Sequence, residues 1–211
     1  MTNKADKIQS KIWKAYGVVS KTLGREFEVY RTNTLVNPIQ NQYNVATTLA
    51  AFSQDERYKK AHDGGLSIWL CWMDGGFGDL FDVAQGDVLC SPADGETYFI
   101  ASVQQHAPIR AIKAPNTINV SRVGYTDTGH SDTDVATLIP CSIQQPSSGD
   151  FGAPYIGPSS SLDDPQPKYV INLWDPADTI VIGDVVTDER GNVSQVLSVY
   201  KSDMGMELVT G

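Results

Sequence analysis

Residues Gly86–Val103 read GDVLCSPADGETYFIASV. Two short extended runs, Asp87–Cys90 and Glu96–Val103, are separated by turn-forming residues. The strongest turn signal is the pair Asp94-Gly95, because glycine accepts the positive φ that tight hairpin turns require. The stretch therefore predicts a β-hairpin.

The same pattern returns later in the chain. Residues Gly183–Val199 read GDVVTDERGNVSQVLSV, which is one residue shorter between the same landmarks. Two interpretations stay open: an internal duplication, or the general similarity of β-hairpins in soluble proteins. Two copies also fall short of a solenoid, which normally needs at least three repeats.

A single amphipathic helix is predicted at the start of the chain, from about residue 4 to 23. Apolar residues recur there at spacings of three and four: Ile8, Ile12, Ala15, Tyr16, Val19 and Leu23. Gly24 is a natural stop. The helix lysines are expected to form an ordinary solvated face, with a basic face for a partner or a membrane surface as the alternative.

After the helix, short strand-like segments dominate. Glu26–Arg31 alternates cleanly and places Phe27 and Val29 on one face. The apolar run Val45–Phe52 fits a strand or a helix. The predicted fold class is mainly β with an N-terminal α-helix: a small β-barrel or sandwich, an extended Pro/Ser/Gly-rich arm and a C-terminal β-hairpin module.

The clearest compositional boundary is the segment 142–168, which contains five of the eleven prolines together with many Gly and Ser residues. Such a composition cannot bury a core, so it predicts a linker or an extended arm. The predicted domains are 1–141 (helix plus β body), 142–168 (arm) and 169–211 (small β module). Within the arm, Tyr155 and Ile156 are the candidate interaction residues, either on a neighbouring subunit or on their own domain.

Composition limits the classes of function. The net charge of -9 disfavours sequence-specific nucleic-acid binding. The chain has no signal-peptide pattern and no apolar run long enough to cross a bilayer, so we expect no membrane partner. Its three cysteines, Cys71, Cys90 and Cys141, suggest free thiols in a reducing cytosol.

Candidate chemical sites are few, and we predict no catalytic, cofactor-binding or metal-binding residues. The run Gly129–Asp134 offers one imidazole and two carboxylates, with Asp127 nearby, but it lacks the spacing of a calcium loop. The glycine-rich run Asp74–Asp79 lacks the phosphate-binding order. Trp69 and Trp72 are expected in the core, with a sugar-stacking surface as the alternative.

Several short segments together resemble a group of tailed-bacteriophage structural proteins of the tail and baseplate region. The resemblance covers about residues 5 to 125. It is carried by Trp13–Gly17, Leu23–Arg31, Gly86–Val88, Tyr98–Ala101, Pro108-Ile109 and Asn119–Arg122.

What the resemblance implies is a non-enzymatic virion protein, made in the host cytoplasm and assembled in several copies around a symmetric tail. Its expected role is to join the tail tube to the baseplate or to an adjacent ring, in contact with other tail and baseplate proteins and with copies of itself. A head-tail connector or completion protein is the alternative in the same class. A carbohydrate-binding module for host adhesion is the alternative in another class.

Overall fold

In the computed structural model, residues 4–54, 68–74, 83–104, 107–126, 129–144, 167–172, 179–202 and 204–211 are described. These residues form one α-helix, one short 3-10 turn (η1, Asn41–Tyr43) and twelve β-strands. The prediction of a mainly β chain with an N-terminal helix is confirmed. Of the two predicted architectures, barrel and sandwich, the structure has the barrel, and it has it twice.

The first barrel is closed in the order β1-β2-β3-β6-β5-β4. Its strands are β1 (Arg25–Tyr30), β2 (Asn44–Gln54), β3 (Ile68–Met73), β4 (Val88–Cys90), β5 (Thr97–Ser102) and β6 (Ile109–Lys113). Phe27 and Val29 both point into it and are fully buried, as the alternation of β1 predicts. The ambiguous run 45–52 is part of β2.

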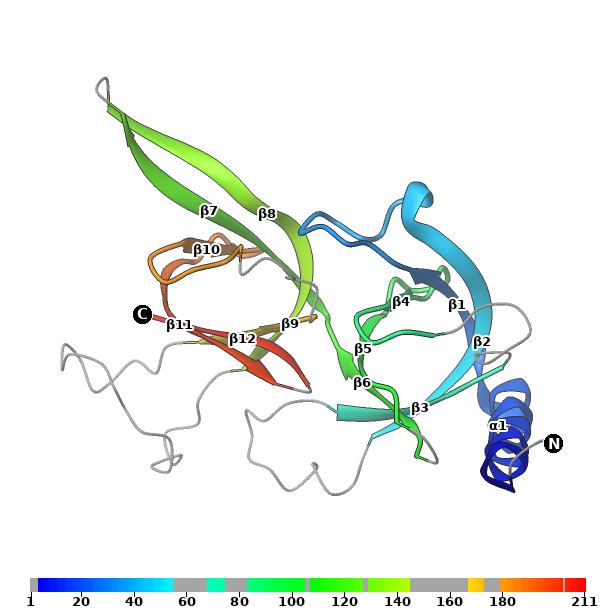
Figure 1. Cartoon of the computed structure of the whole chain (residues 1–211). Helices are drawn as coiled ribbons and strands as arrows, with labels where there is room; N and C mark the ends of the chain where they lie inside the picture. Colours follow the sequence, from blue (N-terminus) through cyan, green and yellow to red (C-terminus); the bar gives the residue numbers. More distant parts are fainter. Residues whose placement is uncertain are drawn as a thin grey trace.

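The second barrel is closed in the order β10-β11-β12-β9-β8-β7 and lies beside the first (Figure 1). Its strands are β7 (Asn116–Thr126), β8 (Gly129–Gln144), β9 (Lys168–Ile171), β10 (Val185–Asp188), β11 (Val193–Ser202) and β12 (Gly205–Thr210). The long hairpin of β7 and β8 extends well beyond the rest of this barrel (Figure 1).

The two barrels have the same topology, because β7 to β12 follow one another exactly as β1 to β6 do around the closed sheet. Both quoted stretches form the predicted hairpins, β4–β5 and β10–β11. Their turns contain Gly95 at φ 71° and Gly191 at φ 81°. The return strands even share a register shift, around Ala101 in β5 and Leu197 in β11. This correspondence favours internal duplication over chance similarity of hairpins.

The predicted domain boundaries are wrong. Residue 141 lies inside β8, and β9 to β12 close a barrel with β7 and β8 instead of forming a separate module 169–211. The barrels meet between β6 and β7, at Ala114 and Pro115. The physical reason is that a hairpin leaves unpaired backbone groups at its two edges, which need neighbouring strands. The neighbours of the second hairpin, β10–β11, are β7 and β12, and these lie on opposite sides of the proline-rich segment in the sequence.

Each barrel has its own core, and a third apolar cluster lies between the barrels. The clusters inside the barrels centre on Tyr98 in the first and Tyr169 in the second. In the third cluster, Phe99 and Ala101 from the outer side of β5 pack with Val170 of β9. The two barrels are therefore joined by buried apolar contacts as well as by the chain.

Helix α1 (Lys4–Leu23) has the predicted length but not the predicted buried face. Ile8 and Leu23 are 55% and 77% exposed, whereas Gln9 and Ser20 are buried. The helix lies against β2 and β3. Gly24 ends it in close contact, since a Cβ there would lie 2.2 Å from the Ser20 carbonyl oxygen.

Candidate interaction surfaces

In each barrel, one arginine and one aspartate form an ion pair with two hydrogen bonds, which we call a clasp. In the first barrel, Arg31 donates from Nε and Nη2 to the two carboxylate oxygens of Asp87, at 2.7 and 2.8 Å. In the second, Arg122 donates in the same way to Asp184, at 2.7 and 2.9 Å. Each pair joins β7, or the residue directly after β1, to the residue that precedes the first hairpin strand, β10 or β4.

The carboxylates of both clasps are buried, and the guanidinium groups reach solvent. The side chains of Asp87 and Asp184 are 0% and 1% exposed, while those of Arg31 and Arg122 are 36% and 45% exposed. The hydrogen bond to Asp184 raises the pKa of Arg122 above its usual value. This arrangement is structural, because it leaves no acidic oxygen accessible to a substrate.

A glycine precedes each clasp aspartate, and it gives the backbone the positive φ of the turn at this position. Gly86 and Gly183 have φ values of 91° and 97°, a conformation that favours glycine. The backbone N–H of Ala84 donates to Asp87 at 2.8 Å, and that of Val181 donates to Asp184 at 2.9 Å. The Gly-Asp-Val sequence is thus the signature of a clasped turn and not of a catalytic loop.

Sequence reasoning missed the arginine half of the clasp. Arg31 and Arg122 were part of the resemblance, but nothing paired them with the repeated aspartates. A signal was present: each arginine follows a valine by two positions, at Val29 and Val120, and the two arginines occupy equivalent positions in the repeat. Aligning the chain on both halves of the repeat would have found it.

Trp69 and Trp72 lie on opposite faces of β3. Trp69 packs against the core of the first barrel, edge-on to Tyr98 with ring centroids 5.9 Å apart. Trp72 faces the other way, since its neighbours Cys71 and Met73 belong to that same core. The two indoles therefore do not form one stacking surface for a sugar ring.

The acidic run near residue 130 lies on the protruding β7–β8 hairpin and not in a loop. Asp132 and Asp134 are exposed there, while Asp127 lies outside the described residues. Among the residues that the structure describes, no group of three or more His, Cys, Asp or Glu side chains could hold a metal ion. No described helix has the length and apolar character needed to cross a membrane.

The predicted interaction residues Tyr155 and Ile156 lie outside the described residues, as do residues 75–79 of the glycine-rich run. The segment that contains Tyr155 connects β8 to β9, which are hydrogen-bonded neighbours in the second barrel. Cys71 and Cys141 are buried, and burial raises the pKa of both thiols.

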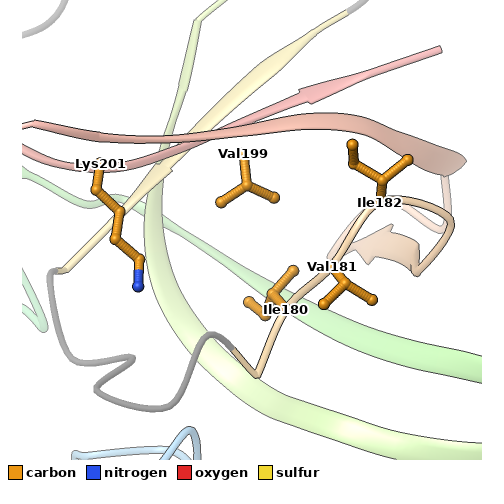
Figure 2. Close-up of a pocket in the computed structure, with 5 residues that line it drawn as sticks. All are labelled: Ile180, Val181, Ile182, Val199 and Lys201. Carbon is orange, nitrogen blue, oxygen red and sulfur yellow. The ribbon is translucent and has the colours of Figure 1, made fainter.

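An apolar cleft of about 480 Å³ opens on the second barrel. Figure 2 shows Val199 and Lys201 of β11 facing the turn that carries Ile180, Val181 and Ile182. Lys201 is the one titratable side chain in this described lining. The cleft can therefore accommodate apolar groups, but its lining offers no pair of groups for acid–base chemistry.

The exposed large apolar side chains of the described residues are unevenly distributed. Three of them are on α1, seven belong to the second barrel, and Val45 is the one on a strand of the first barrel. Contiguous exposed apolar surface commonly marks a contact with another protein. The two ends of the molecule, and not its middle, are thus the candidate interaction surfaces.

The chain matches no known protein-family model, no curated protein and no solved structure.

Proposed function

We propose that this chain is a non-enzymatic structural protein of a tailed bacteriophage, which joins the tail tube to the baseplate or to an adjacent ring. The observation that carries the proposal is the duplicated closed barrel. Its repeated polar residues, the Arg–Asp clasps, each join two segments within one barrel, and their carboxylates are buried. The resemblance of residues 5 to 125 to tail and baseplate proteins gives the class.

A covalent pair of equivalent barrels suits a subunit of a symmetric assembly. Closed assemblies repeat one contact around an axis, and a duplicated chain supplies two similar bodies for each repeat of that contact. Exposed apolar side chains at both ends of the chain are consistent with neighbours at both ends. We place the protein in the virion, with assembly in the host cytoplasm and with tail proteins and copies of itself as partners.

A head-tail connector or completion protein is the second candidate, since small β-barrels also serve at that junction. The alternative of a carbohydrate-binding module rested on Trp69 and Trp72 as one sugar-stacking surface. That support is lost, because the two side chains face opposite sides of β3.

The test is to interrupt the gene with a stop codon and to image the particles that assemble. Tail tubes without baseplates are expected from the first proposal, and full heads with separate tails from the second. Purified infectious particles that lack the chain in mass spectrometry would overturn both.

A further inference from the structure

The outer side of β5 in the first barrel is buried, and the second barrel contributes to its cover. Phe99 and Ala101 are 0% and 1% exposed and share an apolar cluster with Val170. A Cβ on Gly205 would lie 3.4 Å from Phe99 Cε2. Asn172 Nδ2 also donates to the Gly86 carbonyl oxygen at 3.2 Å.

The equivalent surface of the second barrel is uncovered. Val88 pairs with Phe99, and Val185 pairs with Gln195, so Gln195 stands where Phe99 stands in the first barrel. Leu197 likewise corresponds to Ala101 at the shared register shift. The surface formed by Val193, Gln195 and Leu197 is called here the β11 face. Its two apolar members, Val193 and Leu197, are 67% and 42% exposed.

The opposite side of each barrel is covered, but by different elements. In the second barrel, β9 and Asn172 lie against the first barrel. In the first barrel, the corresponding strand β3 is covered by α1, and Lys21 pairs with Asp74 at 3.1 Å. The order along the molecule is therefore α1, first barrel, second barrel. Helix α1 lies at one end of this order, and the exposed β11 face lies at the other.

These two surfaces lie at opposite ends of the molecule (Figure 1). An interface between unlike ends of identical chains is head-to-tail, and it generates a ring when its rotation closes. A second copy is thus the occupant for which the chain already provides a matching surface.

Charge supports the same occupant. Helix α1 contains five lysines and one aspartate. Residues 116–211 contain thirteen acidic and four basic side chains, a net charge of -9, and six of the thirteen acidic residues are among those that the structure describes. Opposite charge on two surfaces speeds their association and sets their orientation.

We propose that the β11 face binds helix α1 of a second copy of this chain, head to tail. The exposed lysines Lys7, Lys11 and Lys14 face the second barrel of the neighbour, and Ile8 or Val18 contacts Val193 and Leu197. This inference rests on the proposed function for its setting and deepens it by naming the contact between copies.

The test uses three variants of the full chain, each checked for folding by circular dichroism. The tail variant is V193E/L197E, the head variant is K7E/K11E/K14E, and the matched control is V45E on the first barrel, where Val45 is 44% exposed. Self-association is measured by sedimentation equilibrium up to about 1 mM, the weak limit of specific association. Each sample is measured at low and high salt.

Concentration-dependent association is expected for the wild type and for V45E, with weaker association at high salt. The head and tail variants are each expected to remain monomeric. Their equimolar mixture is expected to form dimers and nothing larger, because one intact α1 then meets one intact β11 face.

A wild type that stays monomeric at about 1 mM overturns the inference. It is also overturned if the head variant associates like the wild type, because the contact would then join two β11 faces. Neither result depends on the particle imaging that tests the proposed function. Failure of the contact and failure of the virion assignment are therefore distinguishable.

Discussion

Removing the arginine of one clasp should destabilise the protein more than neutralising its aspartate. In the variant Arg122→Met, the Asp184 carboxylate stays buried and keeps the hydrogen bond from the Val181 N–H at 2.9 Å. Breaking a buried ion pair in this way costs about 3 to 5 kcal/mol of unfolding free energy.

The reverse change leaves a charge that water can reach. In the variant Asp184→Asn, the guanidinium of Arg122 is 45% exposed and still donates to the Thr179 carbonyl oxygen at 2.7 Å. The variant then loses only the contribution that a charged acceptor makes to the clasp hydrogen bonds, about 1.5 to 3 kcal/mol of unfolding free energy. The same order should hold for Arg31 and Asp87 in the first barrel, because their geometry is equivalent.

The measurement is urea-induced unfolding followed by circular dichroism, with the double variant Arg122→Met/Asp184→Asn completing the cycle. We expect the double variant to be no less stable than Arg122→Met, because the buried charge is gone. The control Arg190→Met changes an exposed arginine and should stay within about 0.5 kcal/mol of the wild type. An Arg122→Met cost equal to that of the control would refute the reasoning.

Four further predictions follow from local contacts. Asp188 accepts hydrogen bonds from the backbone N–H groups of residues 190 and 192. Although burial opposes the shift, these bonds and the Asn192 side chain hold the pKa of Asp188 below its usual value. The destabilisation by Asp188→Ala in urea should therefore be present above about pH 4 and should shrink as the pH falls through the folded-state pKa; a pH-independent difference would contradict this. Gly183→Ala should cost about 1 to 2 kcal/mol in thermal unfolding, because its φ of 97° strains any side chain, and an unchanged melting temperature would argue against that strain. Val170→Ala should cost about 1 to 3 kcal/mol and separate the unfolding of the two barrels in calorimetry, whereas a single unshifted transition would contradict the apolar junction. Cys71 and Cys141 should react with iodoacetamide only after unfolding, because both are buried and their pKa values are raised; mass spectrometry that finds them alkylated in the native protein would disprove it.

Local sequence patterns predicted the elements that depend on local interactions. The helix from residue 4 to 23 follows from apolar spacing, and both hairpins follow from Gly95 and Gly191 at positions of positive φ. These features were readable because each depends on a few consecutive residues.

The buried faces were less predictable than the elements themselves. Alternation suggests one buried face for β5, yet all six of its residues are buried, because the second barrel covers its outer side. Likewise, Gln9, Gly17 and Ser20 of α1 are buried, whereas Ile8 and Leu23 of the predicted apolar stripe are exposed. Burial depends on what packs against a surface, which periodicity alone does not specify.

The β class, the helix and the repeated hairpin could be predicted from the sequence, because propensity and turn chemistry act over short distances. The folded chain was needed to show that β7 and β8 pair with β9 to β12, that Arg31 and Arg122 bind the repeated aspartates, and that Val193 and Leu197 of the β11 face are exposed. Strand pairing and burial join residues far apart in the chain, such as Arg122 and Asp184, and their partners are fixed by closure of the whole barrel.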